Sequence, residues 1–303
     1  MTDPQLGAVM SERGQLINLA YRLLGSLAEA EDVVQETYVR WYALSDRQRA
    51  DVLNPGAWLT TVASRICLDL LGSARARRER YVGEWIPEPL PGRSEWLGGP
   101  VPADPADRVT LDESIGMAFL VVLDAMTPAE RVAFILHDVF RYSFAEVAEV
   151  VGRTPAACRQ LASSARRRVD TAQRPSGVDR AEVVREFKRA WETSDIEGLI
   201  GLLDPTAIAT ADGGGLAVTF RHPIVGGERI ARIWIELATR RTDVTLIERT
   251  VNGQPGLVAE VDGAIVSVYA FDIADGRITR IWVVRNPEKL RPWTVQEQHE
   301  NLS

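Results

Sequence analysis

Apolar residues recur with helical spacing through the first quarter of the chain. The stretch Arg13–Leu24 places its apolar residues at i, i+3, i+4 and i+7, and a second run extends from Leu27 to about Leu44. Ser26 and Glu29 form a capping-box pattern at the start of this second run. A third amphipathic run opens at Pro55, a residue that suits the first position of a helix. The pattern predicts a bundle of helices in this part of the chain.

The stretch from Phe134 to Val169 predicts two helices joined by a tight turn. Ser143 begins the first helix with another capping box, Gly152 ends it, and Thr154 caps the second. The second helix has an apolar stripe, and its opposite face is polar and partly basic. Such a face suits the major groove of DNA, and an ordinary helical corner with a solvated face is the alternative. The candidate DNA-reading residues are Thr154, Pro155, Ala156, Arg159, Gln160, Ser163, Arg166 and Arg167.

The helix that begins at Pro55 has an aromatic residue, hydroxyl groups and charged groups on its outward side and flanks. Thr60 is one of the hydroxyl residues. A basic run follows them. Aromatic side chains stack on unpaired bases, and arginines follow the backbone of a single strand. A core position for the tryptophan is the alternative. The candidate residues for contact with a melted strand are Trp58, Thr61, Ser64, Arg65, Asp69, Arg75, Arg77 and Arg78.

The helix from Leu27 to about Leu44 predicts a different kind of surface. It buries Trp41 in the bundle, while its opposite face combines Asp32 and Glu36 with the apolar Val39. Acidic groups beside an exposed apolar residue suit a protein partner better than a phosphate backbone. A solvated acidic face is the alternative.

A segment rich in proline and glycine separates the two helical parts, from Glu84 to Asp107. It has neither a helical nor a strand period, so we expect an extended or irregular linker. A flexible tether does not need large apolar side chains. We therefore expect the large apolar side chains of this segment to dock on another part of the protein. They are Trp85, Ile86, Leu90, Trp96 and Leu97.

After the segment Arg174–Gly177 the pattern changes to a mixture of helices and strands. The turn pairs Asn252-Gly253, Asp262-Gly263 and Asp275-Gly276 indicate β-hairpins between alternating runs. Helices that cover a curved antiparallel sheet give an α+β roll with a conical cavity. The expected helices span 181–194, 196–203 and 227–239, and the expected strands span 207–210, 244–251, 257–261, 264–273 and 278–284.

Composition limits the function of the chain. Its 303 residues allow two or three domains, no run is long and apolar enough to span a bilayer, and no secretory signal pattern opens the chain, so a cytoplasmic protein is expected. Cys67 and Cys158 are the only cysteines and both fall on apolar helix faces, so neither a disulfide framework nor a zinc site is expected. The net charge of −7 argues against a freestanding DNA-binding protein and favours one that reaches DNA within a larger assembly.

Three separated motifs occur in one order: L-A-Y-R-L-L-G-S-L-A-E-A-E-D-V-V-Q-E-T-Y-V-R-W, P-G-A-W-L-T-T-V-A-S-R-I-C-L-D, and M-T-P-A-E-R-V-A-F-I-L-H-D-V-F-R-Y-S-F-A-E-V-A-E-V-V-G. In this order and spacing the chain resembles the extracytoplasmic-function (ECF) sigma factors of bacterial RNA polymerase. The resemblance implies a σ2 domain over residues 1–83, a linker over 84–111 and a σ4 helix-turn-helix domain over 112–174.

The resemblance also implies partners. The implied partners are the RNA polymerase core, through its β′ clamp helices and β flap, and promoter DNA. The σ2 helix at Pro55 would read and melt the −10 element, and the second helix of σ4 would read the −35 element. Many family members have Asn where this chain has Arg65, which affects the identity of the −10 bases. The implied polymerase-binding residues are Asp32, Gln35, Glu36, Val39 and Trp41.

Three further motifs resemble one subgroup of these sigma factors, in which a SnoaL-like domain is fused to the C-terminus. The resemblance implies a SnoaL-like regulatory roll over residues 179–290, a tail over 291–303, control of the sigma factor in cis, and no separate anti-sigma protein. Relatives often carry Lys where this chain has Leu216. The motifs are W-I-P-E-P-L (Trp85, Ile86, Pro87, Glu88, Pro89, Leu90), D-G-G-G (Asp212, Gly213, Gly214, Gly215) and N-P-E-K-L (Asn286, Pro287, Glu288, Lys289, Leu290).

The roll also allows other functions. SnoaL-type enzymes use a His and an Asp in the cavity, and His222 has Asp212 and Asp243 as candidate partners. The alternatives to a sigma factor are a DNA-tethered small-molecule enzyme and a ligand-responsive repressor, and an unknown ligand in the cavity is possible under each. We expect no catalytic residues, no metal and no cofactor.

Overall fold

A computed structural model describes residues 12–78, 81–92, 115–172 and 179–294. The chain divides into two compact units. The first holds the helices up to residue 78 and those from Phe119 to Ala172. The second holds residues 81–92, the short stretch 115–118 and residues 179–294. Residues 81–83 were expected to end the σ2 domain, but they belong to this second unit and are counted with the linker below. Within the described residues, no helix has an apolar stretch long enough to cross a bilayer.

The first unit begins with a bundle whose helices start where the sequence predicts. Gly25 ends the first of them with a φ of 72°, and the Ser26 side chain caps the next by accepting from the backbone N–H of Glu29 at 3.4 Å. The pattern did not reveal the six-residue α4, which buries none of its side chains. The helices are α2 (Arg13–Leu24), α3 (Leu27–Tyr42), α4 (Asp46–Asp51) and α5 (Pro55–Arg78).

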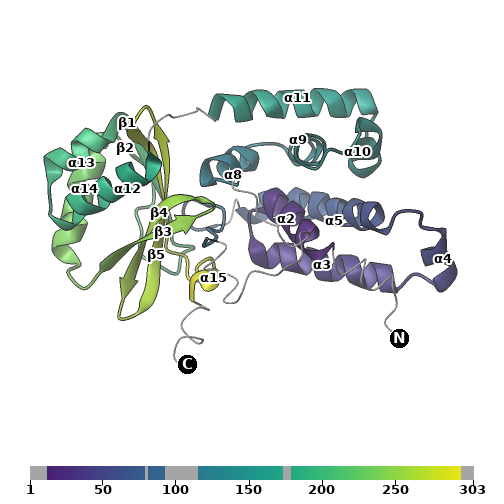
Figure 1. Cartoon of the computed structure of the whole chain (residues 1–303), viewed down its shortest axis with the longest axis horizontal. Helices are drawn as coiled ribbons and strands as arrows, with labels where there is room; N and C mark the ends of the chain where they lie inside the picture. Colours follow the sequence, from purple (N-terminus) through teal and green to yellow (C-terminus); the bar gives the residue numbers. More distant parts are fainter. Residues whose placement is uncertain (1–11, 79–80, 93–114, 173–178, 295–303) are drawn as a thin grey trace. The chain divides into compact units, whose positions relative to one another are not determined.

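The second part of the first unit contains the predicted pair of helices joined by a tight turn (Figure 1). Ser143 and Glu146 form a complete capping box, and Gly152 ends the helix with a φ of 68°. Thr154 caps the next helix by accepting from the backbone N–H of Ala157 at 3.2 Å. The elements are α8 (Met117–Asp124), α9 (Pro128–Phe134), the π-helical turn η1 (Ile135–Val139), α10 (Phe144–Val151) and α11 (Pro155–Ala172).

The two helical parts of the first unit contact each other along α5, against which α9 and α10 lie. Arg131 is only 4% exposed and donates a hydrogen bond to the backbone carbonyl of Leu23 at 2.7 Å. Arg65, which is exposed, donates to the carbonyl of Glu149 at 2.9 Å. These contacts join α5 and its neighbours to the helix-turn-helix.

The second unit is an α+β roll on a six-stranded sheet with the order β2-β1-β6-β5-β4-β3 within residues 203–284. The sequence predicted a wholly antiparallel sheet, and this is wrong for β1 and β6, which are parallel. Hairpin signals report only strands that follow one another in the chain, whereas β1 and β6 are neighbours in the sheet but far apart in the sequence. The elements are α12 (Arg180–Glu192), α13 (Ile196–Leu202), β1 (Leu203–Asp212), β2 (Ile224–Val225), α14 (Gly227–Arg240), β3 (Thr245–Val251), β4 (Gln254–Val261), β5 (Ala264–Ala274), β6 (Arg277–Val284) and α15 (Arg291–Thr294).

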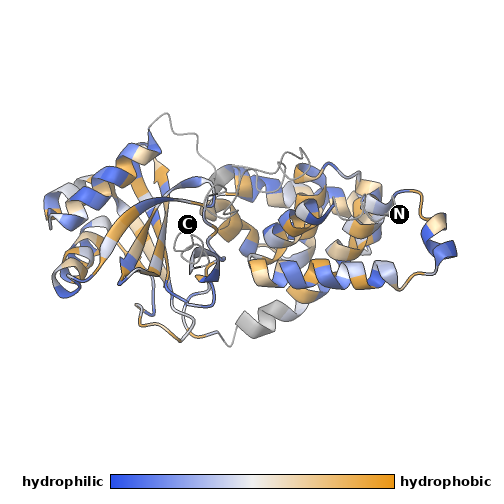
Figure 2. Ribbon diagram, turned by 60° about the horizontal axis from the view of Figure 1, so that its bottom comes forward, coloured by the Kyte–Doolittle hydropathy of each residue, from blue (hydrophilic) through white to orange (hydrophobic). Residues whose placement is uncertain are grey.

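Different parts of the chain cover the two faces of this sheet. Helices α12 and α14 pack on one face and enclose a core that includes Phe187 and Phe271. On the other face Val268 and Trp282 are also buried. Helix α15 contacts β5 and lies on the side away from α12–α14, and the linker pairs with β3 through Pro91 (Figure 1). Figure 2 shows mostly hydrophobic strands in the roll beside helices in which hydrophobic and hydrophilic residues alternate.

Candidate functional site

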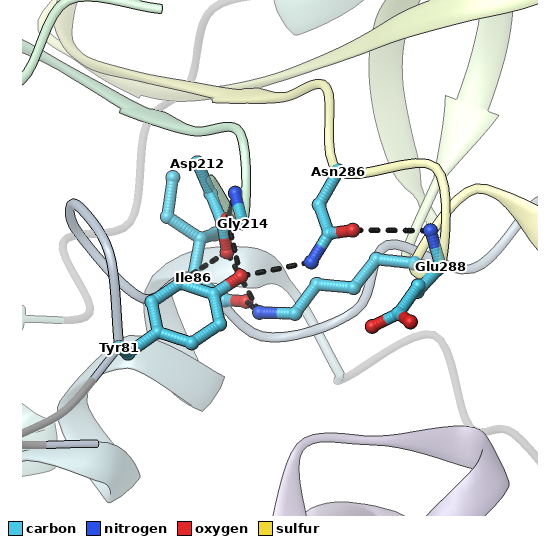
Figure 3. A network of polar contacts seen from close by, with 7 residues as sticks. Tyr81, Ile86, Asp212, Gly214, Asn286 and Glu288 are labelled. Carbon is cyan, nitrogen blue, oxygen red and sulfur yellow. Dashed lines mark hydrogen bonds and ion pairs between the residues drawn. The ribbon is translucent and has the colours of Figure 1, made fainter. Parts of the chain in front are cut away.

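Asp212, the last residue of β1, is fully buried and accepts hydrogen bonds from four donors (Figure 3). Its Oδ1 accepts from the Tyr81 hydroxyl at 2.6 Å and from the Gly214 backbone N–H at 3.0 Å. Its Oδ2 accepts from the Ile86 backbone N–H at 3.0 Å and from Lys289 Nζ at 2.7 Å. A buried charge is costly unless it is paired and hydrogen-bonded, so these donors stabilise the carboxylate where the linker meets the roll.

Lys289 is held by the linker as well as by Asp212. Its ammonium group donates to the backbone carbonyl of Ile86 and lies 4.2 Å from the centre of the Trp85 ring and 5.2 Å from that of Tyr81. Cations are attracted to the faces of aromatic rings, and the attraction is stronger when water is excluded. The Lys289 side chain is 10% exposed, so most of its charge is compensated by these groups.

Asn286 ties the end of β6 to the end of β1 and to the linker. Its Nδ2 donates to the Tyr81 hydroxyl at 2.8 Å, and its Oδ1 accepts from the Glu288 backbone N–H at 3.0 Å (Figure 3). The backbone N–H groups of Arg285 and Asn286 donate to the backbone carbonyl of Asp212 at 2.7 and 3.0 Å. Three segments far apart in sequence therefore share one hydrogen-bonded network.

The environment of Tyr81 raises the pKa of its hydroxyl above the ordinary value of 10.0. Burial is the main cause, and the hydrogen bond to Asp212 adds to it because ionisation would remove the donated proton. The hydroxyl therefore stays protonated and remains a donor throughout the neutral and mildly alkaline range.

A second contact holds the far end of the linker. The Leu90 backbone N–H donates to Asn252 Oδ1 at 3.2 Å, and the Asn252 N–H donates to the Leu90 carbonyl at 2.8 Å. Trp293 of α15 donates through Nε1 to the Pro89 carbonyl at 2.8 Å. The prolines of the linker lack N–H groups, so the linker has few backbone donors. The roll binds the donors that remain and the backbone carbonyls.

The D-G-G-G loop requires glycine for steric reasons at two positions. A Cβ on Gly213 would overlap the backbone carbonyl of Ala217. Gly214 has a φ of 61°, and a Cβ there would overlap the buried side chain of Asn286. These two glycines let the loop approach its neighbours closely enough to donate to Asp212.

We call Tyr81, Ile86, Asp212, Asn286 and Lys289 the linker site. The structure brings all three predicted motifs to this site or to its edges. Ile86, Pro87, Glu88, Pro89 and Leu90 are buried, Trp85 is half-buried, and Pro287 and Glu288 are exposed. Trp96 and Leu97 lie outside the described residues.

The sequence analysis missed Tyr81, Asn252 and Trp293. Tyr81 follows the basic run with no periodic pattern around it. Asn252 has a φ of 49° and forms the predicted hairpin turn, but its second role as a linker partner has no sequence signal. Trp293 lies just beyond the N-P-E-K-L motif, and its large apolar side chain was a usable signal for docking.

The candidate −35 residues lie together along α11. Thr154, Pro155, Ala156, Arg159 and Gln160 are exposed, and so are Arg166 and Arg167, whereas Ser163 is half-buried. The Arg159 guanidinium lies 5.2 Å from the centre of the Phe144 ring, which orients it. Arg166 Nε donates to Asp138 at 2.8 Å, and Arg167 donates to Ser163 at 3.3 Å.

The candidate −10 residues are less accessible than the sequence suggested. Thr60 and Ser64 were placed on the outward side and flanks of the helix, but they are 2% and 0% exposed because α9 and α10 lie against α5. Thr60 also shares a side-chain hydrogen bond with Tyr142. Trp58 is half-buried and meets Trp41 edge-on, with ring centres 5.2 Å apart.

The rest of the −10 set is distributed along α5. Thr61 is half-buried, and Arg65 and Asp69 are exposed. Arg75, Arg77 and Arg78 continue α5, but their side chains lie outside what the structure describes.

The candidate polymerase-binding face on α3 is exposed at all but one position. Asp32, Gln35 and Glu36 are exposed, and Val39 is a 63% exposed apolar residue among them. Trp41 is only 2% exposed and packs on Trp58. The prediction that Trp41 belongs to the exposed docking face is therefore corrected. It supports the surface from inside the bundle.

The roll contains a cavity of about 650 Å³ between the sheet and its helices. Trp191, Phe220, Trp234, Tyr269 and Val283 are among the residues that line it. The cavity opens beside the loop that follows Asp212, because Val218 and Thr219 lie at its rim. Its size is that of a small-molecule site.

The histidine considered for catalysis lacks the arrangement of a dyad. His222 is exposed, Asp212 is engaged by the linker site, and Asp243 is paired with Arg241 at 2.9 Å. Within the part of the chain that the structure describes, no cluster of three or more His, Cys, Asp or Glu side chains is placed to hold a metal ion. Cys67 and Cys158 are both buried and free, and burial raises the pKa of both thiols.

Comparison with known proteins agrees with this organisation. The models of sigma-70 region 2 and sigma-70 region 4 match residues 8–77 and 116–169. The ECF RNA polymerase sigma factor SigJ of Mycobacterium tuberculosis is 36% identical over 302 residues, covering 94% of this chain and 93% of SigJ. The probable ECF RNA polymerase sigma factor SigI of the same species is 35% identical, with 96% of each chain covered. The crystal structure of SigJ gives a TM-score of 0.74 at 35% identity and covers 95% of this chain and 98% of that one.

Regions 2 and 4 in a single chain define an RNA polymerase sigma factor, a class of transcription proteins rather than enzymes. The full-length relatives then identify the family: the chain belongs to the ECF sigma factors, which direct RNA polymerase to promoters. Its C-terminal part has the α+β roll that the resemblance to SnoaL-like domains implied, with helices on one face of a six-stranded mixed sheet.

Proposed function

We propose that this sigma factor is controlled in cis by the roll, which holds the linker between its two DNA-reading regions. The observation that carries the proposal is the linker site: two of the four hydrogen-bond donors to the buried carboxylate of Asp212 come from the linker. Tyr81 and Ile86 come from the linker, and Lys289 binds the Ile86 carbonyl at the same point. Removing the linker would leave the carboxylate with Lys289, the Gly214 N–H and water, and would leave the ammonium group with Asp212 and water.

The roll holds both ends of the connection between σ2 and σ4. Residues 81–92 lie on the roll, and on the return of the chain Ile115 and Met117 are buried while Gly116 lies close to Gln254 of β4. The connection from Glu79 to Gly116 comprises about 40 residues and could span on the order of 130 Å when released and extended. The −10 and −35 elements are about 25 base pairs apart, roughly 85 Å along the DNA axis. Only the released connection has ample reach.

Two free-energy contributions to the docking of the linker on the roll, apolar burial and the loss of backbone freedom, are of comparable size and opposite sign. Burial of Ile86 and Leu90 contributes about 3–6 kcal/mol, and fixing the backbone from Ile86 to Leu90 costs about 5–10 kcal/mol. The polar contacts of the linker site therefore decide whether the linker is bound. A balance of this kind allows a switch, because a shift of a few kcal/mol changes the dominant state.

We further propose how the released protein acts. The exposed face of α11, centred on Arg159 and Gln160, reads the −35 element, and α5 with its basic continuation reads and melts the −10 element. Asp32, Glu36 and Val39 on α3 bind the polymerase core in the cytoplasm. The covered state of Thr60 and Ser64 supports the need for opening before σ2 engages DNA.

Transcription in vitro with core polymerase tests the cis control. The full chain is compared with a chain that ends at Val284 and with Lys289→Met, on a promoter selected in vitro from a random library. Both changes remove the Lys289–Asp212 pair and are expected to raise transcript yield about tenfold or more, the equivalent of 1.4 kcal/mol. Glu288→Gln is the matched control, because it keeps the backbone N–H that donates to Asn286 and removes only a carboxylate whose effect on Tyr81 is electrostatic. Equal yields from all four proteins would contradict the proposal.

A further inference from the structure

We propose that the cavity of the roll binds a small, uncharged, flat aromatic molecule that carries a carbonyl or similar hydrogen-bond acceptor, and that its binding releases the linker. The second half of this proposal rests on the cis control proposed above. The argument combines the chemistry of the cavity wall with the position of the loop that joins the cavity to the linker site.

A donor without a partner lies in the cavity wall. Trp234 is 1% exposed and lines the cavity, and its Nε1 has no hydrogen-bond partner among the described residues. Buried N–H groups are nearly always paired, so an unpaired one in a cavity wall indicates a place for an acceptor from outside the chain. Tyr269 lines the same cavity, and burial raises the pKa of its hydroxyl, which shares a hydrogen bond with Ser267 of the cavity wall and is protonated at neutral pH. The wall therefore supplies donors.

The other residues of the cavity wall indicate the shape and polarity of the ligand. Trp191 and Phe220 add aromatic surface, and Leu246, Val266 and Val283 add aliphatic surface. Flat aromatic rings pack well on such a wall. The charged residues of the cavity lie at its outer rim, where Glu192, Glu236, Arg240 and Arg241 are exposed and Arg285 is half-buried. The charges of Arg241 and Arg285 act on Tyr269, but these two arginines are already bonded to Asp243 and to the Val218 carbonyl. An ion in the interior would lose its hydration and gain only this partly compensated charge, so the interior favours an uncharged molecule.

One loop connects the cavity rim to the linker site. Gly214 donates to Asp212 at one end, and Val218 lies at the cavity rim at the other. Arg285 donates to the Val218 carbonyl at 2.6 Å, and Arg285 is the neighbour of Asn286 in the linker site. The loop lies against the linker at Gly215, where a Cβ would come within 3.1 Å of Val82.

The loop has apolar surface that a ligand would cover. Val218 is 87% exposed and Leu216 is 64% exposed. An apolar molecule at the rim gives both side chains a surface on which to pack, and this draws the loop toward the cavity and away from Val82 and the linker. A ligand shifts such an equilibrium only by the difference in its affinity for the two states, and burial of these side chains supplies that difference.

Three probes of one ring system test the chemistry of the site in the full-length protein. They are 2-acetonaphthone, which has a carbonyl acceptor, 2-isopropenylnaphthalene, in which a methylene group replaces the carbonyl oxygen, and the anion 2-naphthoate. Calorimetry is expected to show about three- to tenfold tighter binding of the ketone than of the hydrocarbon, the effect of one hydrogen bond, and the weakest binding for the anion. Equal affinity for the ketone and the hydrocarbon overturns the proposal without the need for any variant.

Substitution then locates the donor. Trp234→Phe keeps an aromatic ring, although a smaller one, and removes the N–H, so the preference for the ketone is expected to disappear. Trp282→Phe is the matched control, because Trp282 is buried outside the core that surrounds the cavity. Retention of the ketone preference in Trp234→Phe would show that the site lies elsewhere.

Hydrogen exchange of the Ile86 and Leu90 amides measures release of the linker, because both amides donate to the roll. Saturating 2-acetonaphthone is expected to accelerate their exchange at least about threefold. Unchanged exchange with bound probe overturns the coupling. Lys289→Met tests the cis control separately, because it releases the linker without any probe. If this substitution has no effect on transcription, the proposed function is contradicted, whatever the probes do.

Discussion

The linker on the roll and the helix-turn-helix on α5 are two internal contacts of different construction. The first is centred on a buried ion pair in which Asp212 is 0% exposed and has four donors. The second includes the exposed Arg65 bonded to a backbone carbonyl and the hydrogen bond between Thr60 and Tyr142. Breaking a buried pair by removing one partner costs far more than losing a hydrogen bond to an exposed group.

This difference indicates an order of events for activation. The contact around α5 also contains one buried charge, Arg131, but this residue keeps its ion pair with Asp124 of the same helical part when the two parts separate. Release of the linker, in contrast, removes Tyr81 and Ile86 from the buried Asp212 carboxylate. Under the proposed cis control, release of the linker comes first and limits activation, and separation of the helix-turn-helix from α5 follows. The predictions below test this contrast, beginning with the largest expected effect.

Lys289→Met is expected to have the largest effect. It leaves the buried Asp212 carboxylate without its cation, at a cost of about 3–5 kcal/mol for a broken buried pair. Urea unfolding of the roll measures this loss, with Glu288→Gln as the control that leaves stability unchanged. A loss below about 1 kcal/mol would place the linker site in the same class as the contact on α5, and the contrast would fail.

Gly214→Ala is expected to have the next largest effect. The substitution puts a side chain at a φ of 61° and against Asn286, which costs about 1–3 kcal/mol and displaces the donor from Asp212. Thermal unfolding and exchange of the Ile86 amide report the two consequences. Gly201→Ala in α13 is the control, since a Cβ there meets no neighbouring atom and helical alanine is favoured over glycine.

Tyr142→Phe is expected to weaken the contact on α5 by only about 1 kcal/mol, the net value of one hydrogen bond. Transcription in vitro should rise less than about fivefold, well below the effect of Lys289→Met. Tyr42→Phe, at an exposed position, controls for loss of a tyrosine hydroxyl. A response to Tyr142→Phe as large as that to Lys289→Met would reverse the proposed order of events.

The effect of pH on Tyr81 is expected to be the smallest. Its folded pKa is raised, so the stability it contributes is fully present below pH 10, the unfolded value, and declines as pH rises from there toward the folded pKa. The difference between ultraviolet titrations of the native protein and Tyr81→Phe isolates its ionisation. Titration of this difference signal near pH 10 would contradict a hydroxyl held by Asp212.

Much of the fold could be predicted because its signals are local. Ser26, Ser143 and Thr154 begin helices through their own capping hydrogen bonds, and Gly152 ends one through its positive φ. The hairpin residues Asn252, Asp262 and Asp275 likewise adopt positive φ at the predicted turns. Each of these features depends on a few neighbouring residues.

The features that could not be predicted depend on distant segments. Nothing near β1 or β6 indicates that these strands pair in parallel, and nothing near Ser64 reveals that another part of the unit covers it. The motif residues Asp212 and Lys289 were found through family resemblance, but Tyr81, their third partner, has no such motif. Tertiary contacts of this kind are absent from periodicity and capping patterns.

Hydrogen exchange at Ile86 and Leu90 tests the central claim most directly, comparing the free protein with the same protein bound to core polymerase and promoter DNA. Both amides donate to the roll, to Asp212 and to Asn252 respectively. We predict strong protection in the free protein and at least about tenfold faster exchange in the complex, because the linker must leave the roll before both elements are engaged. Equal protection of the two amides in both states would contradict control through the linker.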